Sequence, residues 1–473
     1  MWLVSAKELV SVGAQAQSGE PVMPEDRPGI THSRLMRFWM DPAYMAIRLG
    51  QAGPVVRVKA GPTAAFQVND DSLMRKVGCR EESFAFWGTD PSLREMAGDG
   101  LLGAEGQVHR ARRAAMSPAF TASRLAGFGA GVRTVTEHLL DRLPADRPAD
   151  MCFEMTRLAC GLIIGCILRS EISPQSLSSL AAARTALSTG TVWHLALSPW
   201  PWMPVPRRRG FRRALALLDQ VGQEVMSRHR PDEDGLDVVS QLALVSHGHP
   251  HAARHDVRTL IHAGMENVAA TLAWACYELG RHPHHQQALR EEAQAVLGEE
   301  RDPVLLRPDR LPLAAAFVTE VMRLHGPPFL FRHARHAMDL GGVRLPERAV
   351  VTMPVGALRR DPARYPQSDV FDPLRWMPGA EPRVSPGGLL AYGLGPRHCP
   401  GAAAADIMLP VALATLVSSR ALRTARRGQR VRVGMDIVPM PRGLTMTAAI
   451  RHPEPHATGT GPTHAHTDVS PHS

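Results

Sequence analysis

The sequence predicts a mainly helical protein with small β-sheets, an α+β chain, on three observations. Hydrophobic patterns of helical period dominate from about Leu73 to Gly298. Shorter stretches of alternating apolar residues on either side of that span are typical of strands. With 473 residues, 44% of them hydrophobic, the chain is long enough to bury a sizeable core.

Composition and charge argue against other classes of protein. The net charge is +9, but the arginines are scattered and no compact basic helix carries interleaved aromatic residues, which disfavours nucleic-acid binding. A basic face that docks an acidic protein partner is a better use of this charge. The six cysteines form no CxxC pair, as expected in a reducing compartment. The N-terminal residues lack the pattern of a signal peptide or membrane anchor, so we expect a cytoplasmic protein.

The predicted elements of the first two thirds follow in chain order. Residues 1–50 are a mixed lead-in. Residues 53–70, GPVVRVKAGPTAAFQVND, predict two short strands separated by glycine. Residues 256–283 predict a long apolar helix with an acidic start and a Gly-Arg-His-Pro stop, and residues 286–298 and 313–326 predict two shorter amphipathic helices.

The last third is richer in proline and glycine. Residues 327–391 mix loops with predicted short strands at 341–346 and 349–355. Residues 453–473 form a polar, His- and Pro-rich tail that we expect to be disordered.

A single cysteine, Cys399, stands among glycines, prolines and two basic residues in AYGLGPRHCPGAA. This neighbourhood offers neither an apolar core, nor a disulfide partner, nor a second zinc ligand nearby. The segment Y-G-L-G-P-R-H-C-P-G, from Tyr392 to Gly401, resembles the haem-binding signature of the cytochrome P-450 family, F-G-x-G-x-R-x-C-x-G. The resemblance implies haem b as cofactor and Cys399 as the thiolate ligand of its iron.

The other residues of this segment suit such a ligand. Gly393 and Gly395 would let the backbone curl under the porphyrin, where a side chain would clash. Arg397 would pair with a haem propionate. Backbone amides after Cys399, with a helix starting near Gly401, would stabilise the thiolate.

Further motifs occur in the order found in the family. Glu320 and Arg323 form an E-x-x-R pair one helical turn apart, and Arg375 lies in FDPLRW, similar to the family's F-x-P-x-R-W. The resemblance implies that these three charges interlock as a buried structural network. His109 and Arg113 match H-x-x-x-R and share one helix face.

His109, Arg113 and Arg332, in PPFLFRHAR, are implied partners of the haem propionates. Together the motifs extend from about Pro54 to Arg451 and imply one haem domain over residues 51–452. In the P-450 fold the haem lies between a long distal helix and a proximal cysteine loop, which is the arrangement that we expect.

The distal helix of the family carries A-G-x-[DE]-T, and this chain has AGMEN, with Ala263, Gly264, Glu266 and Asn267. The resemblance implies that the Ala–Gly pair leaves room for dioxygen, and that the acid and the threonine pass protons to it. His262, next to this pair, either lines the pocket or is a packed polar residue. A second departure is Pro410, which should kink the helix after Cys399.

Asn267 stands where the family has threonine. An amide can donate and accept hydrogen bonds and so orient a water, but it has no hydroxyl to rotate. Three interpretations stay open: ordinary monooxygenation with help from substrate or water; a different outcome, such as coupling, ring formation or desaturation; or neutral drift, with Glu266 alone moving protons.

The substrate and the partner proteins are implied by the family resemblance and not by the spacing of residues in this sequence. The resemblance implies a soluble bacterial monooxygenase that hydroxylates or epoxidises a lipophilic specialised metabolite, a terpenoid or polyketide, with O2. The alternatives are a haem-thiolate oxidase without oxygen insertion and a non-catalytic haem binder. The chain carries no flavin or nicotinamide fingerprint, so we expect a separate ferredoxin and ferredoxin reductase, attracted by Arg110 and Arg112. Residues 198–210 are either a lid over the pocket or a connector.

Overall fold

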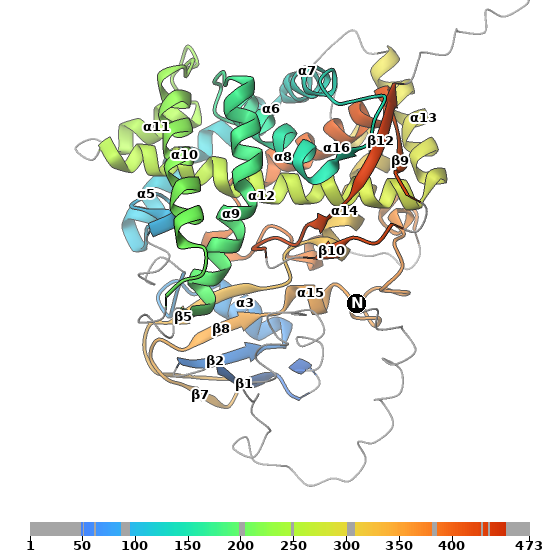
Figure 1. The fold of residues 1–473 in the computed structure, drawn as a ribbon. Helices are drawn as coiled ribbons and strands as arrows, with labels where there is room; N and C mark the ends of the chain where they lie inside the picture. The colour runs from blue at the N-terminus through green and yellow to red at the C-terminus, as the bar shows by residue number, and fades with distance from the viewer. Residues whose placement is uncertain are drawn as a thin grey trace, which may run out of the picture.

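The structure is a computed structural model that describes residues 49–450 except 51, 61–62, 87–94, 198–203, 247–249, 300–307, 381–385, 427–428 and 434–435. The predicted lead-in up to residue 48, the tail from residue 453 and the first six residues of the 198–210 segment lie outside the described residues. The described part is mainly helical with small sheets, so the predicted fold class is confirmed. Helices fill the upper part of Figure 1, and a small sheet lies below them with α3 (Asp71–Cys79).

The larger helices have the following bounds: α5 (Gly106–Met116), α7 (Phe128–Leu140), α8 (Met151–Leu162), α9 (Pro174–Leu197), α10 (Arg208–Ser227), α11 (Val238–Val245), α12 (Pro250–Arg281), α13 (Pro283–Glu299), α14 (Pro312–His325) and α16 (Ala402–Ser419). Shorter helical segments are η4 (Ser117–Phe120), α6 (Ala122–Leu125), the π-helical η5 (Ile163–Ile167), η7 (Pro308–Arg310), α15 (Val355–Leu358), η8 (Pro373–Trp376), η9 (Pro386–Leu389) and η10 (Gly395–Arg397).

The largest sheet has the strand order β1-β2-β8-β5-β3, with bounds Val55–Ala60, Thr63–Val68, Val350–Met353, Leu330–Ala334 and Phe84–Ala85. Its β2–β8 pair is parallel and its other pairs are antiparallel. A second sheet orders β4 (Ala149–Asp150), β12 (Thr445–Ile450) and β9 (Arg420–Thr424). Two ribbons pair β6 (Met338–Leu340) with β7 (Val343–Leu345) and β10 (Arg432–Val433) with β11 (Pro441–Arg442). The strands predicted within 53–70, 341–346 and 349–355 are confirmed.

Helix α12 is the central element of the helical part (Figure 1). It packs against α8, α10, α14 and α16, and Ile261, Met265 and Ala269 on it are fully buried. The helix begins at Pro250, earlier than the predicted start at Asp256, because proline fits the first turn of a helix, where no intrahelical N–H bond is needed. It ends at Arg281, where the predicted stop lies.

Helix α16 follows the cysteine loop and runs without a break through Pro410. Pro410 cannot donate the usual helical bond to the carbonyl of Asp406. Among the described residues, α16 is also the one helix that is long and apolar enough to cross a membrane, but 61% of that stretch is buried inside the protein. Burial on this scale is what a core helix of the fold requires.

Candidate functional site

Cys399 lies in the loop between η10 and α16, where its backbone is fixed from both sides. Its amide donates to the Tyr392 carbonyl over 2.8 Å. Burial raises the pKa of the Cys399 thiol, while the Gly401 amide and the charge of Arg113 act to lower it. A buried thiol of this kind ionises readily once a metal cation binds it, because the cation compensates for the lost hydration of the thiolate.

The two glycines of the loop are required by backbone conformation. Gly393 and Gly395 have φ values of +81° and +60°, in the region that favours glycine. A Cβ on Gly395 would lie 2.6 Å from the Gly78 carbonyl oxygen and 2.8 Å from the Cys79 Cα. The tight neighbour of Gly395 is therefore the end of α3, whereas a Cβ on Gly393 would meet an atom no closer than 3.6 Å.

Arg397 and Arg332 both lie over the ring of Phe86, with their guanidinium carbons 5.1 and 5.2 Å from its centroid. Arg397 is neutralised within the chain, because its side chain lies 3.0 Å from Glu105 and 3.5 Å from Glu81. Arg332 makes no ion pair within the described residues. Its recorded hydrogen bond goes to the Phe331 carbonyl, and burial lowers its pKa to about 10.

His109 and Arg113 lie one turn apart on α5, beside this cluster. Burial lowers the pKa of His109 to about 4, so its imidazole is neutral near pH 7 and its 3.4 Å approach to Glu81 is not an ion pair. Its Nδ1 is buried without a hydrogen-bond partner in the described structure. Burial also lowers the pKa of Arg113, and the charge of Cys399 opposes that change.

These features fit the haem that the sequence implied. A buried guanidinium without a carboxylate and an imidazole nitrogen without a partner are groups that cofactor carboxylates would satisfy. Cys399 is placed as a single soft ligand, which is what haem-thiolate iron takes from a protein. Within the described residues, no three His, Cys, Asp or Glu side chains are grouped so that they could hold a metal ion. A haem site needs no such cluster.

The three charges expected to interlock do so. Arg323 donates to both carboxylate oxygens of Glu320 over 2.8 Å, and Arg375 donates to one of them over 3.1 Å. The Trp376 indole and the Asp372 amide add bonds of 2.8 and 2.9 Å. The network joins α14 to η8 and has no exposed surface at the Glu320–Arg323 pair.

The middle of α12 presents two different faces. Ala263 and Asn267 are exposed to open space, while Met265 and Glu266 between them are buried. Asn267 Nδ2 donates to the Ala263 carbonyl over 2.9 Å, so its Oδ1 remains available as an acceptor. The Thr271 hydroxyl donates to the Asn267 carbonyl one turn further on.

Gly264 does not add room on this face. A Cβ there would lie 2.5 Å from Ile163 Cδ1, so the space beside Gly264 is filled by a side chain from the π-helical segment η5. We expect room for dioxygen beside the Ala–Gly pair. Of the two residues, Ala263 is exposed, whereas the space beside Gly264 is occupied by Ile163.

Glu266 has a partner that the sequence analysis did not identify. Arg184, on α9, lies 3.0 Å from Glu266, and both side chains are nearly inaccessible. Burial raises the pKa of Glu266 to about 7, with Arg184 opposing the rise and Asp436 adding to it. A lone arginine in the apolar run LAAARTALSTG was a usable signal, since such a residue requires a buried anion.

Arg112 and His262 also have definite places. Arg112, predicted as a docking residue on the outer side of α5, is 9% exposed and pairs with the buried Asp256 at 3.5 Å, so that prediction is wrong. Three residues along a helix return to nearly the same face, which puts Arg112 beside His109. Arg110 is 59% exposed and remains a surface cation. His262 is buried, which lowers its pKa to about 4.

Comparisons with known proteins agree with this geometry. The family model for cytochrome P450 matches residues 37–434. Cyclooctatin synthase of Streptomyces melanosporofaciens is 28% identical over 80% of this chain and 85% of its own length. Pentalenene oxygenase of Streptomyces avermitilis is 26% identical over 87% and 94%. The solved structure of retinoic acid-bound cyanobacterial CYP120A1 has a TM-score of 0.73 at 21% identity, covering 88% of this chain and 96% of that one.

Proposed function

The chain belongs to the cytochrome P450 family and is a haem b monooxygenase of that family, and from this premise we propose that it inserts oxygen into a terpenoid by hydroxylation or epoxidation. Two relatives have names that specify an alkene and an alkenol as substrates, pentalenene oxygenase and cyclooctat-9-en-7-ol 5-monooxygenase of Streptomyces melanosporofaciens, the latter 27% identical over 82% of this chain. An apolar polycyclic substrate suits the open face of α12 at Ala263, which carries no charge.

We assign the haem contacts by chemistry. Cys399 would be the iron ligand, and Arg332, His109 and Arg113 would hold the haem carboxylates. Arg397, which pairs with Glu105 and Glu81, would have to exchange one of those contacts to join them. The bound haem supplies the iron at which dioxygen is activated. Gly393 and Gly395 keep the loop in the conformation that presents the Cys399 sulfur, and the N-terminus of α16 favours its negative charge.

We further propose that Glu266 and Asn267 handle protons on the distal side. With its pKa raised to about 7, Glu266 is partly protonated near neutral pH and can both give and regain a proton. The free Oδ1 of Asn267 can accept a hydrogen bond from a water or a protonated oxygen next to Ala263. The observation that carries the monooxygenase proposal is that an acceptor, Asn267 Oδ1, lies on the open face of α12, while the proton donor next to it in the chain, Glu266, lies on the buried side of the helix against Arg184.

Electrons would come from a separate ferredoxin and ferredoxin reductase in the cytoplasm. Arg110, on the exposed side of α5, lies 3.6 Å from Glu81 but is 59% exposed, so it would still attract an acidic partner, and this helix also carries His109 and Arg113. Docking at α5 would bring the partner close to the proposed propionate contacts.

The experiment is turnover of cyclic terpene alkenes with surrogate ferredoxin and reductase under isotopically labelled dioxygen. We expect products with one labelled oxygen atom. Products that have lost hydrogen or joined two carbons, without label, would instead establish an oxidase. That second candidate is favoured by Asn267, because it lacks the threonine hydroxyl and commits one N–H to the Ala263 carbonyl.

A further inference from the structure

A second buried ionic cluster lies between α9, α12 and the segment that leads into β11. Arg184 lies 3.0 Å from Glu266 and 3.6 Å from Asp436, so one guanidinium serves two carboxylates. The Asp436 side chain has no exposed surface and is also held by Arg442 through two bonds of 3.0 and 2.5 Å. The cluster therefore alternates acid and base: Glu266, Arg184, Asp436, Arg442.

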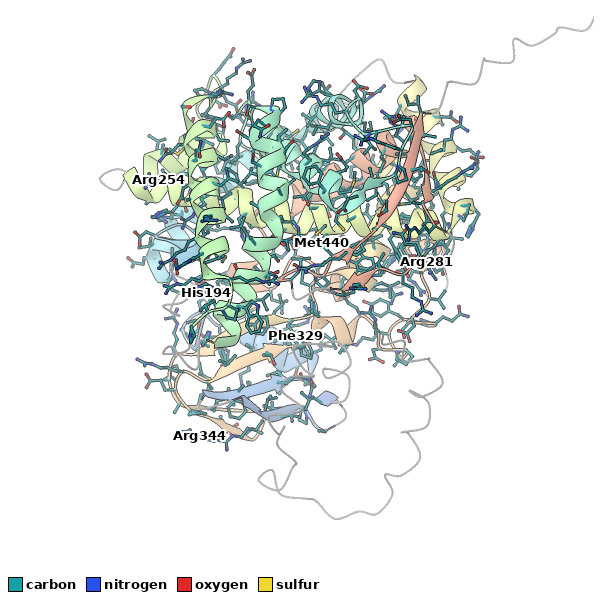
Figure 2. The ribbon with its side chains drawn as sticks, in the orientation of Figure 1. His194, Arg254, Arg281, Phe329, Arg344 and Met440 are labelled. Carbon is teal, nitrogen blue, oxygen red and sulfur yellow. The ribbon has the colours of Figure 1, made fainter. Side chains whose placement is uncertain are left out.

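The cluster is fixed by neutral hydrogen bonds as well as by charge. The Ile437 amide donates to the Ser188 hydroxyl over 3.0 Å, and Arg442 donates to the Thr189 hydroxyl over 3.2 Å. Ser188 and Thr189 lie one turn after Arg184 on α9. Trp274 of α12 donates to the Pro439 carbonyl over 2.9 Å, and Figure 2 shows the neighbouring Met440 close below α12. Asp436 is thus held in place relative to both helices.

Glu266 is incompletely satisfied within this cluster. Its second carboxylate oxygen is buried without a hydrogen-bond partner in the described structure. The groups that act on it are Arg184 and Ser188 from α9 and Asp436 from the C-terminal segment, and Cys160 of α8 also lies within electrostatic range. Arg184 is the cation among these groups, and it also pairs with Asp436.

We propose that Asp436 is a positioning residue for Glu266: by sharing Arg184, it keeps that guanidinium from neutralising Glu266 fully and so leaves Glu266 able to hold a proton on the buried side of α12. This inference rests on the proposed proton role of Glu266 and adds the residue that controls the protonation of Glu266. Removing the negative charge at 436 leaves Arg184 to Glu266 alone and leaves Arg442 as an unpaired cation nearby. Both changes favour the ionised form of Glu266.

The test is a pH titration of the Glu266 carboxyl in haem-loaded protein. Infrared spectroscopy monitors the titration through the band of the protonated carboxyl, which is assigned to Glu266 because it disappears in Glu266→Gln. In Asp436→Asn we expect the midpoint to fall by about one pH unit. Asp436→Glu, which keeps the charge, should restore most of the original midpoint. Asp436→Ser, which is smaller, replaces Asp436→Asn if that variant does not fold.

The matched control is Asp219→Asn. Asp219 pairs with Arg258 at 3.0 Å and also joins a neighbouring helix to α12, but it does not act on Glu266, so the midpoint should stay in place. An unmoved midpoint in Asp436→Asn, or in Asp436→Ser where that variant replaces it, or an equal shift in Asp219→Asn, would overturn the positioning role of Asp436.

A second measurement separates this inference from the proposed function. The fraction of electrons lost as peroxide is followed against pH, and its profile in Asp436→Asn should move with the infrared midpoint. If the infrared midpoint moves but peroxide loss is the same in wild type, Asp436→Asn and Glu266→Gln, then Asp436 positions Glu266 but the proton role of Glu266 is refuted.

Discussion

Two buried carboxylates of this protein lie next to arginines, yet their surroundings differ. Glu320 receives bonds on both oxygens from Arg323, and further bonds from Arg375, Trp376 and the Asp372 amide. Glu266 has one 3.0 Å contact with Arg184, which it shares with Asp436, and one oxygen without a partner. The same residue types therefore build a fully bonded support in one place and, in the other, a carboxyl whose pKa burial raises to about 7.

The largest expected effect comes from breaking the fully bonded cluster. Glu320→Gln leaves Arg323 as a buried cation without its anion, so we expect the free energy of unfolding to fall by about 3–5 kcal/mol. Chemical denaturation with haem absorbance as a second probe measures this. The comparison variant Glu137→Gln, which breaks a pair whose two side chains are both partly exposed, Arg133 at 32% and Glu137 at 49%, should cost about 1 kcal/mol or less. Equal losses in the two variants would contradict the assigned support role of Glu320.

The next effect is on turnover. Glu266→Gln removes the proton donor but leaves Arg184 paired with Asp436, so folding should suffer far less than in Glu320→Gln. Product formation per electron pair should fall by about 100-fold, with peroxide taking its place. Unchanged product yield, measured by electron and oxygen balance, would show that the proton takes another route.

The pH dependence of stability further distinguishes Glu266 from Glu320. Burial raises the pKa of Glu266 from 4.5 to about 7 in the folded protein. The folded state therefore holds this proton more tightly than the unfolded state does, and its stabilising contribution is complete below pH 4.5 and lost as pH rises through 7. The free energy of unfolding of Glu266→Gln relative to wild type, measured by urea unfolding, should therefore increase as the pH rises from 5 to 8. A constant difference across that range would contradict the raised pKa.

The smallest effect is expected at Asn267. In Asn267→Thr the hydroxyl replaces the Nδ2 bond to the Ala263 carbonyl, so we expect peroxide loss to change by about fivefold or less, as for one hydrogen bond, with little change in substrate affinity. The haem band shift on substrate addition reports the affinity. If the affinity changes and peroxide loss does not, Asn267 contacts substrate rather than a proton carrier.

Much of the local structure was predictable from the sequence. The loop around Cys399 and the chemical motif on α12 are continuous stretches, so their glycines and acid could be identified without the fold. The Glu320–Arg323 pair was also local, because one helical turn joins the two residues.

Contacts between distant segments could not be predicted in this way. Arg184 and Asp436 reach Glu266 only because α9 and the segment before β11 pack on α12, and periodicity does not say which helices meet. For the same reason, the sequence did not show that Ile163, from η5, fills the space beside Gly264. Arg112 is different: its spacing from His109 already placed both on one face.

The central claim is that Cys399 presents a thiolate to haem iron on one side while α12 handles protons on the other. The most direct measurement is the absorption spectrum of the reduced holoenzyme with carbon monoxide, compared with Cys399→Ala and with Cys79→Ala, a nearby exposed cysteine. The account predicts the red-shifted thiolate band in wild type and Cys79→Ala, and its loss in Cys399→Ala. A thiolate band that survives in Cys399→Ala would contradict it.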